Sequence, residues 1–260
     1  MQNQPHQPVH VFILAAGKGA RMRQSLPKPL TVVAGVPLID RMIDAVRGAF
    51  GEHWSIVVGH GANAIRAHLG NDVTYVYQRT RKGTGHALKI ALKGLPKSLP
   101  DYLVVIPGNF PLLTSTTLRE LFQKSVDSGA PITVATAIAP GDFLPDNPFW
   151  FSSRVVRGLG GGIRRIVALK DADRDERAIH EVDTGCYVFN TRWVLERITK
   201  LHPVTPSREY RLSDLVGIAA IEGTRVAAHQ MSNWREALSV NTQEDLRFVE
   251  EILLGKIVSY

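Results

Sequence analysis

The feature that most constrains the fold is an apolar run that ends in a glycine-rich, basic loop. The run "HVFILAA" at 10–16 has the composition of a buried strand, and "GKGARMRQSLPKPL" at 17–30 follows it directly. Strand-like runs and amphipathic helix patterns then alternate along the first half of the chain. This alternation favours an α/β fold with a mixed, mostly parallel sheet and helices on both faces.

The expected elements follow from hydrophobic spacing and from glycine and proline punctuation. Strands are expected at 10–16, 54–61, 73–78, 102–108, 132–138, 164–170 and 185–190. Helices are expected at 37–46, at 84–95 with Thr84 as N-cap, through Leu118, Leu121 and Phe122, and at about 242–254. The run "GLGGG" at 158–162 indicates a hairpin turn or a surface loop. The chain shows no repeat or linker, which predicts a single domain over 1–260.

Composition narrows the class of protein. The 260 residues are 44% hydrophobic, enough for a substantial core, and Cys186 is the single cysteine, which argues against a disulfide framework or a thiolate zinc site. The N-terminal "MQNQPHQP" lacks the features of a signal peptide, and no run approaches the ~20 apolar residues of a membrane span, so a cytoplasmic protein is expected. The formal charge of +7 favours anionic small molecules. Nucleic acid is not expected, because the basic residues are dispersed.

The loop at 17–30 is suited to phosphate binding, since a strand, a glycine-rich loop and a helix present backbone N–H groups to an anion. A Walker A loop is excluded because Gly17 and Gly19 are only two residues apart. The dinucleotide fingerprint is excluded because Met22 stands where the third glycine is needed. By itself the pair Gly-x-Gly is a weak signal, and a tight turn with solvated arginines is the alternative.

The wider string is more specific. Leu-Ala-Ala-Gly-x-Gly-x-Arg-Met followed by Leu-Pro-Lys resembles the signature of nucleotidyltransferases that join an NTP to a sugar 1-phosphate. The chain is most similar to the uridyltransferase domain of the bifunctional N-acetylglucosamine-1-phosphate enzymes, with matching segments at 57–65, 77–88, 207–219 and 239–246. The resemblance implies a single Rossmann-like nucleotide-diphospho-sugar transferase domain. The acetyltransferase domain of those enzymes is not expected here.

The resemblance also implies roles for individual residues. Arg21 and Lys28 would be the catalytic cations on the phosphates, while Gln78, Gly83 and Thr84 would read the base, with UTP favoured. Thr84 fits a simple helix cap as well, and the two roles are compatible. The nucleotide contacts implied are Leu14, Ala15, Ala16, Gly17, Gly19, Gln78, Gly83, Thr84 and Gly108.

Two asparagines occupy the positions that the resemblance assigns to a magnesium site. Asn109 stands where the family has an aspartate, and Asn241 matches an asparagine ligand, although an N-cap for the last helix explains Asn241 equally well. Mg²⁺ usually takes one or two carboxylates in addition to phosphates. With two neutral ligands, most of the binding of Mg²⁺, or of another divalent cation, is expected to come from the triphosphate.

The acceptor side departs further from the family pattern. The implied acceptor-binding residues are Ala168, Lys170, Asp183 and Thr184. Ala168 replaces a glutamate, Asp183 replaces an asparagine, and the family's Tyr-Gly-Arg-Ile segment has no match in 147–158. Because a pocket that loses a hydrogen-bonding partner discriminates strongly against the original substrate, the acceptor is not expected to be N-acetylglucosamine 1-phosphate.

Several local features leave alternatives open. Asp183 could bind a hydroxyl or an amine of the acceptor, replace the missing metal carboxylate, or pair with Arg164 or Arg165. The aromatic run "PFWF" at 148–151 fits either core packing or a lid over the acceptor. Cys186 is expected to be a packed core thiol. The histidines lack the spacing of a metal site.

The reaction expected is attack by an acceptor phosphate oxygen on the α-phosphorus of an NTP, with pyrophosphate leaving. This chemistry depends on positioning and charge neutralisation. One alternative is a cytidylyltransferase acting on a non-sugar phosphate or phosphonate. The other is a nucleotide- or nucleotide-sugar-binding regulatory protein in which Asn109 has weakened catalysis.

Overall fold

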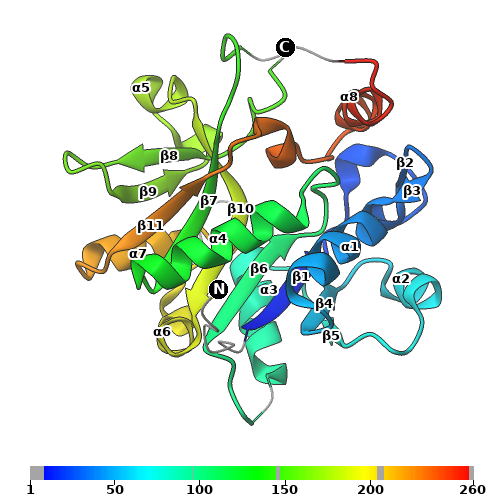
Figure 1. The fold of residues 1–260 in the computed structure, drawn as a ribbon, viewed down its shortest axis with the longest axis horizontal. Coiled ribbons are helices and arrows are strands. Elements are labelled where there is room, and N and C mark those ends of the chain that lie inside the picture. The colour runs from blue at the N-terminus through cyan, green and yellow to red at the C-terminus, as the bar shows by residue number, and fades with distance from the viewer. Residues whose placement is uncertain (1–8, 96, 145–146, 204–207, 258–260) are drawn as a thin grey trace, which may run out of the picture.

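The apolar run that opens the described chain forms β1 (Val9–Ala15), which lies inside a mixed sheet. The structure is a computed structural model and describes residues 9–95, 97–144, 147–203 and 208–257 (Figure 1). The polar stretch 1–8, interpreted above as lacking a signal sequence, and Ser207 of the 207–219 segment lie outside the described residues.

The sheet is parallel at its centre and antiparallel around one strand. Its order is β11 (Val226–Gln230), β7 (Ile132–Ile138), β10 (Glu181–Asn190), β6 (Tyr102–Pro107), β1, β4 (Trp54–Val58) and β5 (Tyr75–Tyr77). The strands β6, β1, β4 and β5 all run parallel, whereas β10 runs antiparallel to both of its neighbours. The hairpin of β8 (Arg154–Arg157) and β9 (Ile163–Val167) extends from β10 (Figure 1). The expected mixed sheet is confirmed.

Helices cover both faces of the sheet, as the alternation predicted. One face packs against α1 (Leu38–Phe50), α4 (Ser115–Ser128) and α8 (Gln243–Leu253), and Figure 1 shows α1 and α4 crossing in front of the strands. The other face packs against α3 (Thr84–Ala91), α6 (Thr191–Arg197) and α7 (Asp214–Ile221). Successive residues of β1 alternate between the two cores, Ile13 in the first and Phe12 in the second. This burial on both faces explains the continuous apolar run.

Short elements complete the connections. The small ribbon of β2 (Val32–Val33) and β3 (Val36–Pro37) precedes α1, α2 (Ala62–Leu69) links β4 to β5, and α5 (Arg174–Arg177) follows β9. The "GLGGG" run forms the turn between β8 and β9, so the predicted hairpin is confirmed. No helix among the described residues is long and apolar enough to cross a membrane.

The N-cap expected at Thr84 is wrong, and of the two alternatives for Asn241 the N-cap is excluded. Gly83, with a φ of 94°, is the N-cap of α3, and Thr84 is its first helical residue. At α8 the N-cap is Thr242, whose hydroxyl accepts from the Asp245 N–H in a capping box, so Asn241 lies one residue outside the helix. Both side chains are therefore available for contacts other than capping.

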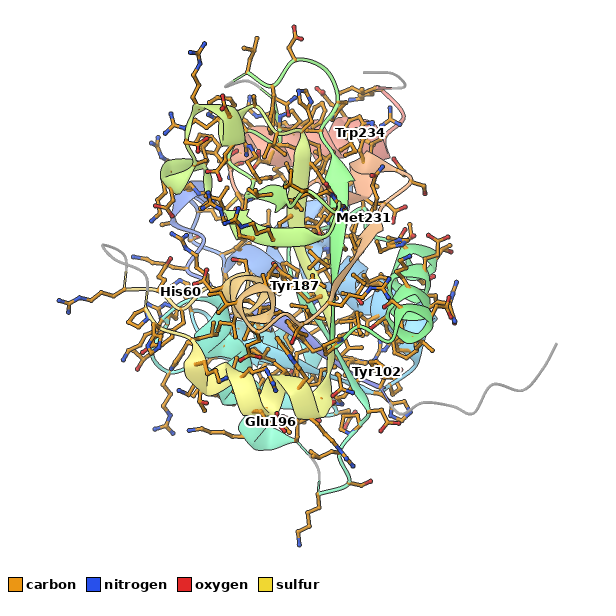
Figure 2. All side chains as sticks on the ribbon, turned by 90° about the vertical axis from the view of Figure 1, so that its left-hand side faces the viewer. His60, Tyr102, Tyr187, Glu196, Met231 and Trp234 are labelled. Atoms are coloured by element: carbon orange, nitrogen blue, oxygen red, sulfur yellow. The ribbon has the colours of Figure 1, made fainter. Side chains whose placement is uncertain are left out.

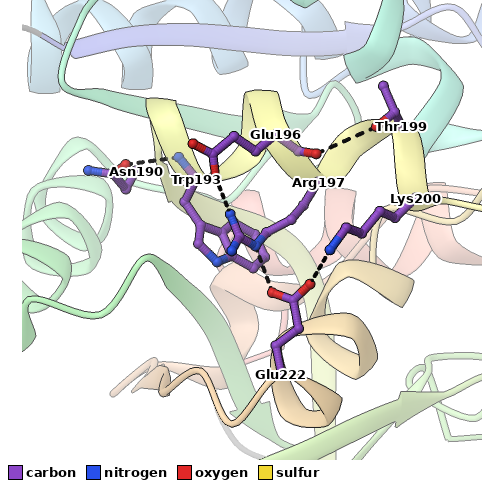
Figure 3. A network of polar contacts seen from close by, with 7 residues as sticks. All are labelled: Asn190, Trp193, Glu196, Arg197, Thr199, Lys200 and Glu222. Carbon is purple, nitrogen blue, oxygen red and sulfur yellow. Dashed lines mark hydrogen bonds and ion pairs between the residues drawn. The ribbon is translucent and has the colours of Figure 1, made fainter.

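An ion network ties α6 to the end of α7 on the second face (Figure 3). Glu222 accepts from Arg197 Nε at 2.7 Å and from Lys200 Nζ at 2.6 Å, while the Asn190 side chain caps α6 by accepting from the Trp193 N–H at 3.0 Å. The network lies at the surface, where ion pairs stabilise only slightly. The network fixes the end of α7 against α6. The segment just before α7 lines the pocket described next.

Candidate nucleotide and acceptor pockets

A cavity of about 440 Å³ opens where the parallel strands end. Loops after β1, β5 and β6 form its walls, which is the position where ligands bind in open α/β sheets. Most of the predicted nucleotide contacts line it, namely Leu14, Ala15, Ala16, Gly17, Gln78, Gly83, Thr84 and Gly108. Lys28 and Asn109 line it as well. The fold thus brings together residues as far apart in the sequence as Leu14 and Glu209.

The two loop glycines serve different purposes. Gly19 has a φ of 62°, and a Cβ placed there would lie 2.7 Å from Cβ of Lys28, so the loop folds back tightly onto that lysine. Gly19 itself does not line the cavity. A Cβ at Gly17 would meet no protein atom within 4 Å, so the space it leaves belongs to the pocket.

A polar cluster at the pocket floor joins three distant segments, of which Lys28 and Asn109 line the cavity and Asn241 lies behind them, outside its lining. Lys28 Nζ donates to Asn241 Oδ1 at 2.7 Å, and Asn109 Nδ2 approaches the same oxygen at 3.4 Å. Asn109 Nδ2 also donates to the Val240 carbonyl at 3.1 Å, which fixes the orientation of that amide. The two asparagines singled out from the sequence therefore lie side by side, with the ammonium of Lys28 on the oxygen of one of them.

The surroundings of Lys28 disfavour its charged form. Burial, together with the nearby charge of Arg21, lowers the pKa of Lys28 to about 8, and Asp245 partly offsets this. Lys28 is thus mainly protonated at neutral pH and only partly neutralised by the protein. Arg21 is exposed on the short 3-10 turn Ala20–Met22 and does not line the cavity, although its charge reaches Lys28.

The donor set around Asn109 and Asn241 does not fit a resident magnesium ion. The Asn241 oxygen already accepts from an ammonium group, and the Asn109 amide presents its nitrogen to that oxygen. Within the part of the chain that the structure describes, no group of three or more histidine, cysteine, aspartate or glutamate side chains could hold a metal. Mg²⁺ prefers carboxylate oxygens, which this floor lacks.

The wall of the pocket near α3 contains an ordered amide. Gln78 is 3% exposed, and its Nε2 donates to the Gly83 carbonyl at 3.0 Å and lies 2.9 Å from His86 Nδ1. Burial and three neighbouring lysines lower the pKa of His86, so its neutral ring can accept this bond. Because the amide nitrogen is occupied in this way, the orientation of Gln78 is fixed.

A strap at 209–212 lies across the start of α3. Tyr210 N–H donates to the Lys82 carbonyl at 2.8 Å, and the Tyr210 carbonyl accepts from the Gly85 N–H at 2.8 Å. The Leu212 N–H donates to the Thr84 hydroxyl at 3.0 Å, which is the role that replaces the predicted cap. A Cβ at Gly83 would lie 2.5 Å from the Tyr210 carbonyl oxygen, so only glycine permits this approach.

A second cavity of about 230 Å³ adjoins the first. The two share Leu14, Thr84 and Pro107 on their walls, and the strap lines both, with Glu209 in the first and Arg211 in the second. Among the predicted acceptor residues, Ala168 and Asp183 line this cavity. The two cavities are therefore neighbours that share part of their walls.

Two of the predicted acceptor residues do not face this cavity. Thr184 is buried and its hydroxyl donates to the Ala135 carbonyl at 2.9 Å, because its side chain points to the opposite face of β10 from its neighbour Asp183. Lys170 is exposed in the short turn Leu169–Asp171 and is not part of the wall. Neither residue therefore belongs to the wall of the second cavity.

Asp183 is held by two donors at the wall of the second cavity. Its Oδ1 accepts from the Gly185 N–H at 2.9 Å and its Oδ2 accepts from the Tyr187 hydroxyl at 2.7 Å. Burial raises the pKa of Asp183 to about 6, despite these two bonds. Tyr187 lies near the middle of the molecule in Figure 2, and burial next to Asp183 raises its pKa well above 10.

The surroundings of Asp183 bear on the three alternatives given above for its role, namely an acceptor contact, a metal carboxylate or an ion pair with Arg164 or Arg165. Arg165 pairs with Glu176 instead, and no ion pair joins Asp183 to either arginine among the described residues. Asp183 lines the second cavity, whereas Asn109 lines the first. The carboxylate therefore belongs to the second cavity.

The aromatic run at 148–151 divides between core and surface. Phe149 is buried, with its ring 6.0 Å from that of Trp234, while Phe151 is exposed. Cys186 is buried, as expected for a core thiol. Neither Phe149 nor Phe151 lines the second cavity.

Sequence reasoning missed several wall residues. They are Lys18, Arg81 and Glu209 in the first cavity, and Ser153, Tyr187 and Arg211 in the second. Arg81 and Arg211 lie inside segments already matched to the family, so their charge was an available signal. Tyr187 gave none, because a tyrosine in an apolar strand is typical of a core position.

The fold is that of an α/β protein with a mixed, mostly parallel sheet and a pocket at its strand ends. Residues 11–183 match the family model described as the MobA-like NTP transferase domain. The chain belongs to this family of nucleotidyltransferases.

Curated relatives with longer chains support the same kinship. The bifunctional protein GlmU of Exiguobacterium sibiricum is 37% identical over 238 residues, which are 92% of this chain and 51% of the relative. That of Heliobacterium modesticaldum is 34% identical over 245 residues, 94% of this chain and 52% of the relative. The chain thus spans about half the length of the curated relatives it matches.

A solved structure shares the fold. A Bacillus anthracis protein described as a glucose-1-phosphate thymidylyltransferase, in complex with sucrose, superposes with a TM-score of 0.72 and covers 97% of each chain. The sequence identity of 18% limits this likeness to the fold.

Proposed function

We propose that this protein transfers a nucleotidyl group, UMP from UTP, to a sugar 1-phosphate or a similar phosphorylated acceptor. A phosphate oxygen of the acceptor attacks the α-phosphorus, a new P–O bond forms, and the bond to the bridging oxygen breaks as pyrophosphate leaves with the electron pair. The observation that carries the proposal is that the two cavities adjoin, with Leu14, Thr84 and Pro107 on the walls of both. It lets two bound substrates meet, which is the main requirement of such a reaction.

The protein's contribution is orientation and positive charge. The glycine loop would hold the triphosphate through backbone N–H groups, and Lys28, with Arg21 at its side, would stabilise the charge that develops on the phosphates. Mg²⁺ belongs to the proposal as part of the nucleotide substrate, since the triphosphate rather than the protein would hold it. Gln78, Gly83 and Thr84 form the wall proposed to read the base, with UTP favoured.

The proposed acceptor is a phosphate other than N-acetylglucosamine 1-phosphate. The methyl group of Ala168 offers no hydrogen bond where the family pattern has a glutamate. Ionised Asp183 only accepts hydrogen bonds, whereas the asparagine of that pattern both donates and accepts. An acceptor with a hydroxyl or an amine directed at Asp183 fits this wall.

The test is pyrophosphate release across UTP, CTP, GTP, ATP and dTTP, each with a panel of acceptors. The panel contains N-acetylglucosamine 1-phosphate, glucose 1-phosphate, and non-sugar phosphates and phosphonates. We expect turnover with UTP and an acceptor other than N-acetylglucosamine 1-phosphate. Turnover with CTP and a non-sugar phosphate or phosphonate would instead support the cytidylyltransferase alternative.

A second candidate function rests on Asn109. If this residue has disabled catalysis, the protein is a nucleotide-binding regulator. The variant Asn109→Asp distinguishes the two, because a disabled enzyme should gain activity whereas a retuned one should gain little. Binding of UTP without turnover across the whole panel would favour the regulator.

A further inference from the structure

The charge around the first cavity is mainly positive. Its wall carries the cations Lys18, Lys28 and Arg81, against the single carboxylate of Glu209. Clefts lined by one sign of charge attract ligands of the opposite sign. A nucleoside triphosphate without a metal ion carries more negative charge than its magnesium complex, so it has the stronger attraction to this wall.

The pocket floor contains a protein cation at the point where a metal would need an oxygen ligand. Asn241 Oδ1 accepts from Lys28 Nζ at 2.7 Å, and Asn241 Nδ2 is committed to Ser239 Oγ at 2.8 Å. The neutral Asn109 amide adds no charge, and its nitrogen is fixed on the Val240 carbonyl. A divalent ion bound here would have to displace or closely approach the ammonium group, which is unfavourable at short distance.

We propose that this pocket binds the metal-free nucleoside triphosphate at least as tightly as its magnesium complex, with the Lys28 ammonium acting as the fixed cation of the site. The inference rests on the proposed nucleotide site and does not depend on turnover. Asn109 is the residue that sets this preference, because a carboxylate at its position would place a hard anionic ligand beside Asn241.

Calorimetric titration with UTP tests the proposal. One titration contains an excess of Mg²⁺, and a parallel one contains EDTA. For the unmodified protein we expect the dissociation constant in EDTA to be equal to or lower than that in Mg²⁺. For Asn109→Asp we expect the reverse, with roughly tenfold tighter binding in Mg²⁺ than in EDTA, because the new carboxylate repels bare phosphate and ligates the ion.

A matched variant controls for the change in net charge. Asn71→Asp makes the same substitution in an exposed turn, where Asn71 accepts from Arg66 and lies outside the wall of the cavity. It should keep the preference of the unmodified protein. If Asn109→Asp does not fold, the comparison of EDTA and Mg²⁺ in the unmodified protein still decides the question.

The outcomes separate this inference from the proposed function. Tighter binding in Mg²⁺ by the unmodified protein would overturn the inference and leave the proposed function standing. Binding in EDTA without turnover on any acceptor would support the inference and count against the proposed function. Failure to bind any triphosphate under either condition would contradict both.

Discussion

Lys28 Nζ lies 2.7 Å from Oδ1 of Asn241, a residue 213 positions further along the chain. This contact connects the glycine loop after β1 to the segment that leads into α8. Asn241 is itself held by its backbone N–H, which donates to Asp245 Oδ2 at 2.7 Å. The first turn of the last helix therefore positions the lysine of the first loop.

Replacing Lys28 should damage function more than stability. For Lys28→Met we expect turnover to fall about 10²–10³-fold, the range seen when one preorganised charge-stabilising group is lost. The thermal midpoint should change little, because the variant removes a charge that is costly to bury. Steady-state kinetics and thermal unfolding measure the two effects. Lys124→Met, on the exposed side of α4, is the control and should change neither.

The capping box of α8 should matter for nucleotide binding. Asp245→Asn weakens the acceptor for the Thr242 and Asn241 N–H groups, so we expect a loss of about 1 kcal/mol in the free energy of unfolding and weaker UTP binding. Glu176→Gln changes the corresponding residue in the capping box of α5 and also removes the charge that pairs with Arg165. The control should lose stability while UTP affinity stays the same. Equal UTP affinities for both variants would show that α8 does not position the site.

The close approach of the strap to Gly83 gives a third prediction. Gly83→Ala should cost about 1–3 kcal/mol for backbone strain, and further stability for the contact with the Tyr210 carbonyl. Gly70→Ala isolates the first term, since Gly70 has a similar φ of 83° but no atom within 4 Å of its Cβ position. Urea denaturation should show the larger loss for Gly83→Ala, together with a raised KM for the nucleotide. Equal losses of stability in the two variants would mean that the strap moves away from the new methyl group at no cost in free energy.

The raised pKa of Asp183 leads us to expect a specific dependence of stability on pH. Its pKa is about 6 in the folded protein against an ordinary value of 3.8, so the folded state binds more protons between these values. The free energy of unfolding should therefore fall as pH rises from about 4 to about 6, by up to about 3 kcal/mol. Asp183→Asn should lack this decrease. Urea denaturation of both proteins at several pH values measures the difference, and parallel curves would contradict the assigned pKa.

Much of the fold was predictable because it depends on local patterns. The run at 10–16 is apolar on both faces of its strand, which is typical of a strand buried between two helix layers. The glycine loop that follows it, together with the wider string through Lys28, predicts a phosphate site, which stays a prediction. The residues expected to contact the nucleotide mostly line one cavity for the same reason, since the ends of parallel strands meet at one edge of the sheet.

The parts that sequence reasoning missed depend on contacts between distant segments. The bond from Leu212 to Thr84 spans 128 residues, and no local pattern distinguishes it from a helix cap. The pairing of Asp183 with Tyr187 depends on a bulge in β10, where the register against β7 shifts between these two residues. Lys170 and Thr184 were assigned from the resemblance alone, and neither lines the second cavity, since Lys170 is exposed in a turn and the Thr184 hydroxyl donates to the Ala135 carbonyl.

Phosphorus NMR of the reaction is the most direct test of nucleotidyl transfer by these adjoining pockets. With UTP and the acceptor identified by the panel, we predict the signal of pyrophosphate together with the paired signals of a new nucleoside diphosphate ester. Lys28→Met should form both products far more slowly. Formation of UDP with orthophosphate or a doubly phosphorylated acceptor would contradict nucleotidyl transfer, because the bond broken would then be at the γ-phosphorus.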